Sequence, residues 1–122
     1  MSTAREIVRA YSDARFRGDV AAALARVGEP FSFRSPLLTC TAPAAHLAGL
    51  PALLRVVTGI ELRSELYGDG EATLVYDLHT ATPAGTQRTA EHFRLTGDRI
   101  TAIHLIFDAV PWRWAARELL TN

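Results

Sequence analysis

The sequence predicts a single α+β domain over residues 1–122, in which a cone-like, curved sheet wraps around three N-terminal helices and leaves an internal pocket. Helical patterns come first along the chain, and long strand patterns follow them. Three of these strands, at 72–82, 86–95 and 100–108, are joined by short turns that contain glycine, which is typical of an antiparallel meander. Strands of about ten residues curl as they twist, so we expect a curved, mixed but mainly antiparallel sheet with a trough.

The N-terminal elements follow from capping and breaking residues. Ser2 or Thr3, followed by Glu6, is a typical helix start, and Gly18 ends the first helix. Asp19 caps a second helix. Pro51 is expected to kink or split the third. The remaining predicted elements are helices at 20–27 and 43–57, strands at 31–34 and 60–67, and a terminal amphipathic segment at 112–120.

Composition and charge exclude several classes of function. The thirteen basic and thirteen acidic residues are interspersed and the net charge is zero, whereas nucleic acid and anionic membranes need clustered positive charge. All the basic residues are arginines, which excludes a lysine Schiff base and a Walker phosphate loop. Cys40 is the single cysteine, and the four histidines lack metal-ligand spacing. No apolar run is long enough for a membrane span or a signal peptide. We expect a cytoplasmic protein without metal, cofactor, nucleic-acid or membrane partner.

Alternation along the strands decides which side chains share a face of the sheet. On the middle strand Glu91 shares a face with Phe93, so an acid stands in an apolar row. The first strand has two rows: Val75, Asp77 and His79 form one, and Leu74, Tyr76 and Leu78 form the other. Polarity alone leaves open which of these two rows points inward.

Two stretches of the chain resemble the nuclear-transport-factor-2-like superfamily, and more closely its SnoaL-like branch of small cyclases and isomerases. They are GDVAAALARVGEPFSFRSP at 18–36 and TGDRITAIHLIFD at 96–108. The shared pattern is a helix ending in Gly-Asp, a short Ala/Leu-rich helix, an aromatic strand closing on Ser-Pro, and a last hairpin. The resemblance covers essentially the whole chain and implies the cone fold, but the chemistry on this scaffold varies widely.

Comparison with the ketosteroid isomerases shows one departure that matters. Tyr11 stands at the position of their first-helix tyrosine, and Glu91 falls near their second acid. Their general base is an aspartate, and Ser35 stands in its place. Because a hydroxyl cannot replace that base, steroid isomerisation by the same mechanism is not expected.

Comparison with the limonene-epoxide-hydrolase branch gives Asp77 its inward direction. Asp77 matches the first aspartate of that family's triad, while Val75 and Leu105 replace the arginine and the second aspartate. That mechanism is therefore not expected either. With Asp77 inward, His79 lies about 6 to 7 Å away on the same face. Desolvation raises the proton affinity of a carboxylate and histidine titrates near neutrality, so the pair predicts a base and an acid.

The candidate site combines these groups. Asp77 is predicted as the base, His79 as the acid or its orienter, and Glu91 or Tyr11 as the group that stabilises an enolate oxygen. Predicted substrate-binding residues are Tyr11, Ser35, Phe93, Leu105, Phe107 and Trp112. Histidines expected outside the site are His46 on the surface of the third helix and His92 and His104 on the convex side of the sheet. Glu91 has a purely structural alternative, as a partner of Arg34 or Arg88.

Two functions fit these observations. The first is cofactor-independent acid/base chemistry (isomerisation, cyclisation, hydration or dehydration) on a small hydrophobic molecule such as a polyketide-like ketone. The second is a non-catalytic ligand-binding or dimerisation module, which the absence of a base at Ser35 favours. In both cases an apolar row of Leu74 and Leu78 on the convex face predicts a homodimer surface.

Overall fold

The structure is a computed structural model and describes residues 2–113 of the chain. The helices are α1 (Ala4–Phe16), α2 (Val20–Leu24), the short 3₁₀ helix η1 (Ala45–Leu47) and α3 (Leu50–Val56). The strands are β1 (Val27–Arg34), β2 (Thr39–Cys40), β3 (Val57–Gly68), β4 (Glu71–Thr80), β5 (Thr86–Thr96) and β6 (Arg99–Ile106). The predicted α+β class is confirmed. Beyond residue 113, the terminal segment predicted at 112–120 lies outside the described residues.

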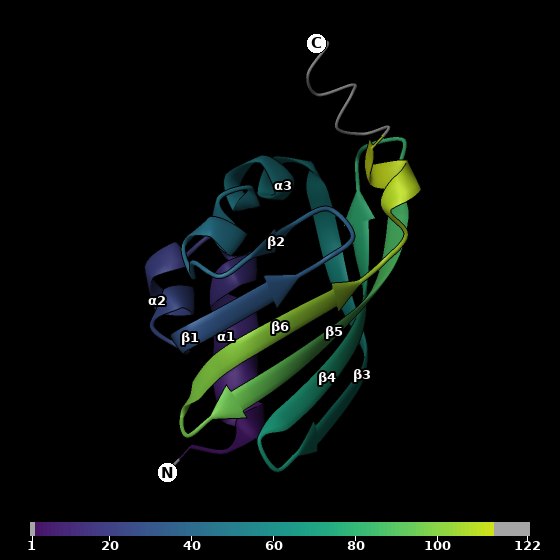
Figure 1. Ribbon diagram of the computed structural model, residues 1–122. Coiled ribbons are helices and arrows are strands. Elements are labelled where there is room, and N and C mark those ends of the chain that lie inside the picture. Colours follow the sequence, from purple (N-terminus) through teal and green to yellow (C-terminus); the bar gives the residue numbers. More distant parts are fainter. Residues whose placement is uncertain (1, 114–122) are drawn as a thin grey trace.

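The six strands form one sheet in the order β2-β1-β6-β5-β4-β3. Only β1 and β6 run parallel, and every other neighbouring pair is antiparallel. The long strands bend as they run, and the helices gather on one side of the sheet (Figure 1). The curved, mixed and mainly antiparallel sheet is therefore as predicted, and the expected meander is β4, β5 and β6.

The helix-capping predictions for the first two helices are confirmed. The Thr3 side chain accepts a hydrogen bond from the backbone N–H of Glu6, and that of Asp19 accepts one from Ala22. Gly18 follows α1 with φ +83°, a left-handed conformation that glycine adopts without strain. The second helix is shorter than the predicted 20–27, because Val27 already pairs with Ile100 of β6.

The third helix, predicted as one element over 43–57, is two. A break at residues 48–49 separates η1 from α3, and Pro51 stands in the first turn of α3, where a missing N–H leaves no bond unmade. The splitting predicted from Pro51 is confirmed. The helix also ends earlier than predicted, because Val57 pairs with Thr80 and begins β3.

The hydrophobic core fills the space between α1 and the concave face of the sheet. Leu74 and Leu78 of β4 belong to it, with 2% and 5% of their surface exposed, and they pack with Ile7 and Tyr11 of α1. The prediction that Leu74 and Leu78 form a convex homodimer surface is wrong, because their row faces the helices. The homodimer itself stays a prediction without this basis. Within residues 2–113 no helix has the length and apolar character that crossing a bilayer requires.

Candidate functional site

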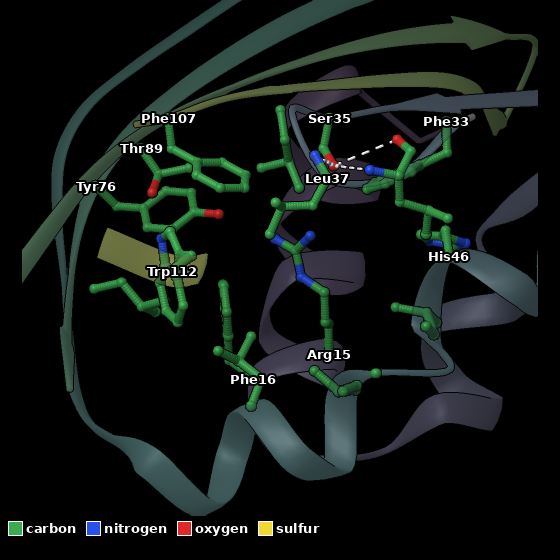
Figure 2. Close-up of a pocket in the computed structure, with 17 residues that line it drawn as sticks. Arg15, Phe16, Phe33, Ser35, Leu37, His46, Tyr76, Thr89, Phe107 and Trp112 are labelled. Carbon is green, nitrogen blue, oxygen red and sulfur yellow. Dashed lines mark hydrogen bonds between the residues drawn. The ribbon is translucent and has the colours of Figure 1, made fainter. Parts of the chain in front are cut away.

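A cavity of about 260 Å³ lies between the helices and the concave face of the sheet (Figure 2). Most of its wall is apolar, and the polar side chains on it are Arg15, Ser35, His46, Tyr76 and Thr89. Four of the predicted substrate-binding residues line it, namely Ser35, Leu105, Phe107 and Trp112. A mainly apolar hollow with few polar groups is the usual character of a small-molecule site.

A buried ion pair stands at this cavity. Arg15 of α1 donates from Nη1 and Nη2 to the two carboxylate oxygens of Glu91 on β5, both at 2.6 Å. The side chains are 7% and 0% exposed, respectively. The Tyr76 hydroxyl donates to the same carboxylate at 3.2 Å. Glu91 thus faces inward on an apolar strand face, as expected, but its partner is Arg15 rather than Arg34 or Arg88, and Arg15 and Tyr76 stand between it and the cavity.

The ion pair keeps Arg15 charged and the neighbouring tyrosine neutral. Burial alone would lower the pKa of Arg15, but Glu91 together with Tyr11 and Tyr76 outweighs burial, and the pKa lies well above its usual value. Burial, reinforced by the charge of Glu91, raises the pKa of Tyr76 far above its usual value. At neutral pH Arg15 is therefore a charged guanidinium and Tyr76 a protonated phenol.

A second polar pair joins Tyr11 to His46. The two side chains meet at 2.7 Å, between the Tyr11 hydroxyl and Nε2 of His46, while Nδ1 of His46 contacts the carbonyl of Pro43. A carbonyl only accepts, so Nδ1 carries the hydrogen and Nε2 accepts from Tyr11. Burial lowers the pKa of His46 below 6.5, so the imidazole is neutral at pH 7.

Three predicted positions need correction. His46 was expected on the surface, but it lines the cavity, because the split of the third helix places it on η1 against the rings of Phe31 and Phe33. Tyr11 was expected to touch substrate, but it is 0% exposed and does not reach the cavity wall. Phe93 is likewise a core residue that packs edge-on against Tyr11, so its predicted place on the wall is also wrong.

The predicted inward direction of Asp77 and His79 is wrong. Tyr76 and Leu78, their neighbours on β4, line the cavity, so Asp77 and His79 lie on the outer face of the sheet. The physical reason is that the row of Leu74, Tyr76 and Leu78 buries more apolar surface against the helices than the other row would. Their catalytic roles were inferred from that direction, so the function proposed below does not use them.

Asp77 has a different environment from the expected dry pocket. Its carboxylate accepts hydrogen bonds from Nε of Arg88 at 2.7 Å and from Nε of Arg63 at 2.8 Å. The bonds from Arg88 and then Arg63 hold the pKa of Asp77 far below its usual range. His79 contacts Glu61 at 2.7 Å and Thr86 at 2.8 Å on the same face. These four partners make an ion-pair and hydrogen-bond cluster on the outer surface.

His92 and His104 also lie on the outer face, as predicted. They stand opposite each other on β5 and β6. Among residues 2–113, no group of three or more His, Cys, Asp or Glu side chains is arranged to hold a metal ion.

Sequence reasoning missed Arg15, His46, Tyr76 and Thr89 as lining residues. A signal for Arg15 was present: it follows Tyr11 by four residues and Ile7 by eight, which places a charge on the apolar face of α1. Glu91 is an acid on the apolar face of a strand. Two opposite charges on buried faces predict an ion pair, because a buried charge needs a partner. The other three residues carry no comparable signal.

Solved structures resemble this chain along most of its length. A protein from Kribbella flavida DSM 17836 is 24% identical with a TM-score of 0.84, and the match covers 100% of both chains. An NTF2-like protein of unknown function from Cytophaga hutchinsonii ATCC 33406 is 19% identical with a TM-score of 0.75, over 93% of this chain and 96% of that one. A proposed polyketide cyclase from Sinorhizobium meliloti is 16% identical with a TM-score of 0.71, over 82% of this chain and 93% of that one.

No protein family profile matches the sequence, and no curated protein matches it. At identities below a quarter, the structural likeness defines the fold. The chain has the NTF2-like fold, so the resemblance seen in its sequence is confirmed at the level of the fold. The SnoaL-like branch within it stays a prediction.

Proposed function

We propose that this chain binds a small, largely apolar molecule in the cavity of its cone. The observation that carries the proposal is the cavity itself: about 260 Å³, with an apolar wall and a few polar groups. This volume lies just below the range of roughly 300 to 1,000 Å³ that is usual for small-molecule pockets, which favours a small ring compound. The likeness to a proposed polyketide cyclase supports a ligand of this kind.

The rim of the cavity supports entry of an apolar molecule. Leu37 and Leu38, on the loop after β1, line the cavity and are 51% and 42% exposed. Large apolar side chains in water cost free energy unless something covers them, and a ligand that enters past them removes part of that cost.

A cavity-filling variant tests the proposal. Leu105→Trp enlarges a residue on the cavity wall, whereas Leu66→Trp makes the same change at a position that is 67% exposed. We expect L105W to lose binding of a small aromatic ketone such as acetophenone and L66W to keep it, measured by ligand-detected NMR with circular dichroism as the check on folding. Equal binding by both folded variants would place the ligand elsewhere.

Acid/base chemistry on the bound molecule is a second candidate, favoured by one observation. His46 is neutral at pH 7 and lines the same cavity as the Arg15 guanidinium. Nε2 of His46 accepts a hydrogen bond from the Tyr11 hydroxyl. That hydroxyl must therefore turn away before Nε2 can take a proton from a carbon atom of the ligand. Arg15 would then stabilise the enolate oxygen.

Exchange of the acetophenone methyl protons in D₂O measures this chemistry. A general base contributes roughly 10²- to 10⁴-fold, so we expect His46→Gln to lower a protein-catalysed exchange rate by that factor and Asp77→Asn to leave it unchanged. If Asp77→Asn lowered the exchange rate and His46→Gln did not, the result would restore the role that the sequence suggested for Asp77. No exchange above the buffer rate leaves the binding function and removes the enzymatic one.

A further inference from the structure

We propose that the ligand of this cavity is a neutral carbonyl compound, such as a ring ketone, quinone or lactone, whose oxygen accepts a hydrogen bond from the Nε–H edge of Arg15. This inference rests on the proposed function, because it names the chemical class of the molecule that the same cavity binds.

Arg15 holds donors that the protein does not use. A guanidinium has five N–H donors, and Glu91 accepts one from Nη1 and one from Nη2. Across residues 2–113, Nε of Arg15 finds no hydrogen-bond partner although the side chain is only 7% exposed. A buried donor left unpaired destabilises the protein, and a ligand oxygen that accepts this N–H removes the penalty.

The hydrogens that Glu91 does not take lie along one edge of the guanidinium plane. Its central carbon lies 4.9 Å from the ring centre of Tyr11 and 4.5 Å from that of Phe16, so aromatic rings pack over the flat group. Both bonds to Glu91 leave from the Nη end. The Nε–H and the neighbouring Nη hydrogen therefore form a separate, in-plane edge. Figure 2 shows the Arg15 side chain reaching into the cavity among the lining residues.

The balance of charge around Arg15 favours a neutral acceptor over an anion. Glu91 already compensates the guanidinium, Tyr11 and Tyr76 are protonated, and His46 is uncharged at pH 7. Arg15 is the only arginine on the described wall of the cavity. A carboxylate ligand would thus bring a second negative charge near Glu91 without a further cation, in surroundings of low dielectric constant. A carbonyl oxygen accepts the hydrogen bond with only a partial charge.

Three single-ring probes that differ in one substituent test this inference at pH 7: acetophenone, ethylbenzene and benzoate. Dissociation constants come from ligand-detected NMR titration. A hydrogen bond from a charged donor is worth about tenfold or more in affinity, so we expect acetophenone to bind at least about tenfold more tightly than ethylbenzene. We expect benzoate to bind more weakly than acetophenone. Infrared spectra should show the carbonyl stretch of bound acetophenone at lower wavenumber than in an apolar solvent.

Two variants locate the donor. Arg15→Lys keeps a positive charge for Glu91 but lacks the planar Nε–H edge, so we expect the ketone preference to fall to within about twofold while ethylbenzene still binds. Arg63→Lys makes the same exchange on the outer face of the sheet, away from the cavity wall, and it should keep the preference. If R15K does not fold, the order of the three probes on the unmodified protein and the carbonyl stretch decide the question.

The failures are distinguishable. Equal binding of ethylbenzene and acetophenone, tightest binding of benzoate, or an unchanged preference in folded R15K would each overturn the carbonyl assignment and leave the cavity as a binding site. Absence of binding by every probe would overturn the proposed function and this inference together.

Discussion

Two carboxylates on neighbouring strands of the sheet are held by arginines in opposite surroundings. Glu91 on β5 faces inward and pairs with Arg15 from a helix 76 residues earlier in the chain. Asp77 on β4 faces outward and is held by Arg88 and Arg63 from the adjacent strands. The inner pair leaves one donor of its arginine unused beside a cavity, whereas in the outer cluster the arginines cover Asp77, which is 5% exposed, and are themselves 48% and 66% exposed to water. The face of the sheet, rather than the type of residue, therefore decides which ion pair can serve a ligand.

The largest expected effect comes from breaking the inner pair. Glu91→Gln leaves the guanidinium of Arg15 buried without a countercharge, and removal of one partner of a buried pair costs about 3 to 5 kcal/mol. Urea denaturation of the variant measures the loss in the free energy of unfolding. The double variant Arg15→Met, Glu91→Leu removes both charges and should recover most of that loss. A loss below about 1 kcal/mol in E91Q would contradict the buried pair.

The next effect separates the two faces of the sheet through matched leucines. Leu74 is 2% exposed and Leu66 is 67% exposed. We expect Leu74→Ala to lower the free energy of unfolding by about 2 to 5 kcal/mol and Leu66→Ala to change it by less than about 0.5 kcal/mol. Urea denaturation under the same conditions compares them. Similar losses in both variants would mean that the faces are assigned wrongly.

Breaking the outer cluster should have a smaller effect that depends on pH. The folded-state pKa of Asp77 is depressed by Arg88 and Arg63, so its contribution to stability is present above the unfolded pKa of about 3.9 and is lost as the pH falls below it. Asp77→Asn should therefore lose less stability than E91Q at pH 7. The difference between D77N and the unmodified protein should shrink below about pH 4 and with added salt, as thermal unfolding can show. A difference that stayed constant from pH 7 to pH 3 would argue against the depressed pKa.

The smallest expected effect concerns His46. Its pKa is lowered by burial, so the unfolded chain binds a proton more readily than the folded protein, and stability falls as the pH drops below about 6.5. His46→Gln should flatten the dependence of the unfolding temperature on pH between about 7 and 5. NMR titration of the imidazole should give a pKa below 6.5. A His46 pKa at or above 6.5 would place the ring in water instead of beside the cavity.

Local signals in the sequence predicted many of the elements, because caps and turns depend on residues close together in the chain. Thr3, Asp19 and Gly18 set the helix ends as expected. The errors came where strand pairing overrides local preference. Val27 and Val57 were read as helix ends, and both begin strands because β6 and β4 offer them backbone partners.

By itself, the sequence determined the α+β class, the meander and the division of each strand into two rows, since these follow from spacing along one segment. Only the tertiary structure decided which row faces the helices, that Arg15 meets Glu91, and that His46 reaches the cavity. The physical reason is that alternation is symmetric between the two faces of an isolated strand. The choice is made by the apolar surface that each row can bury against elements distant in the chain.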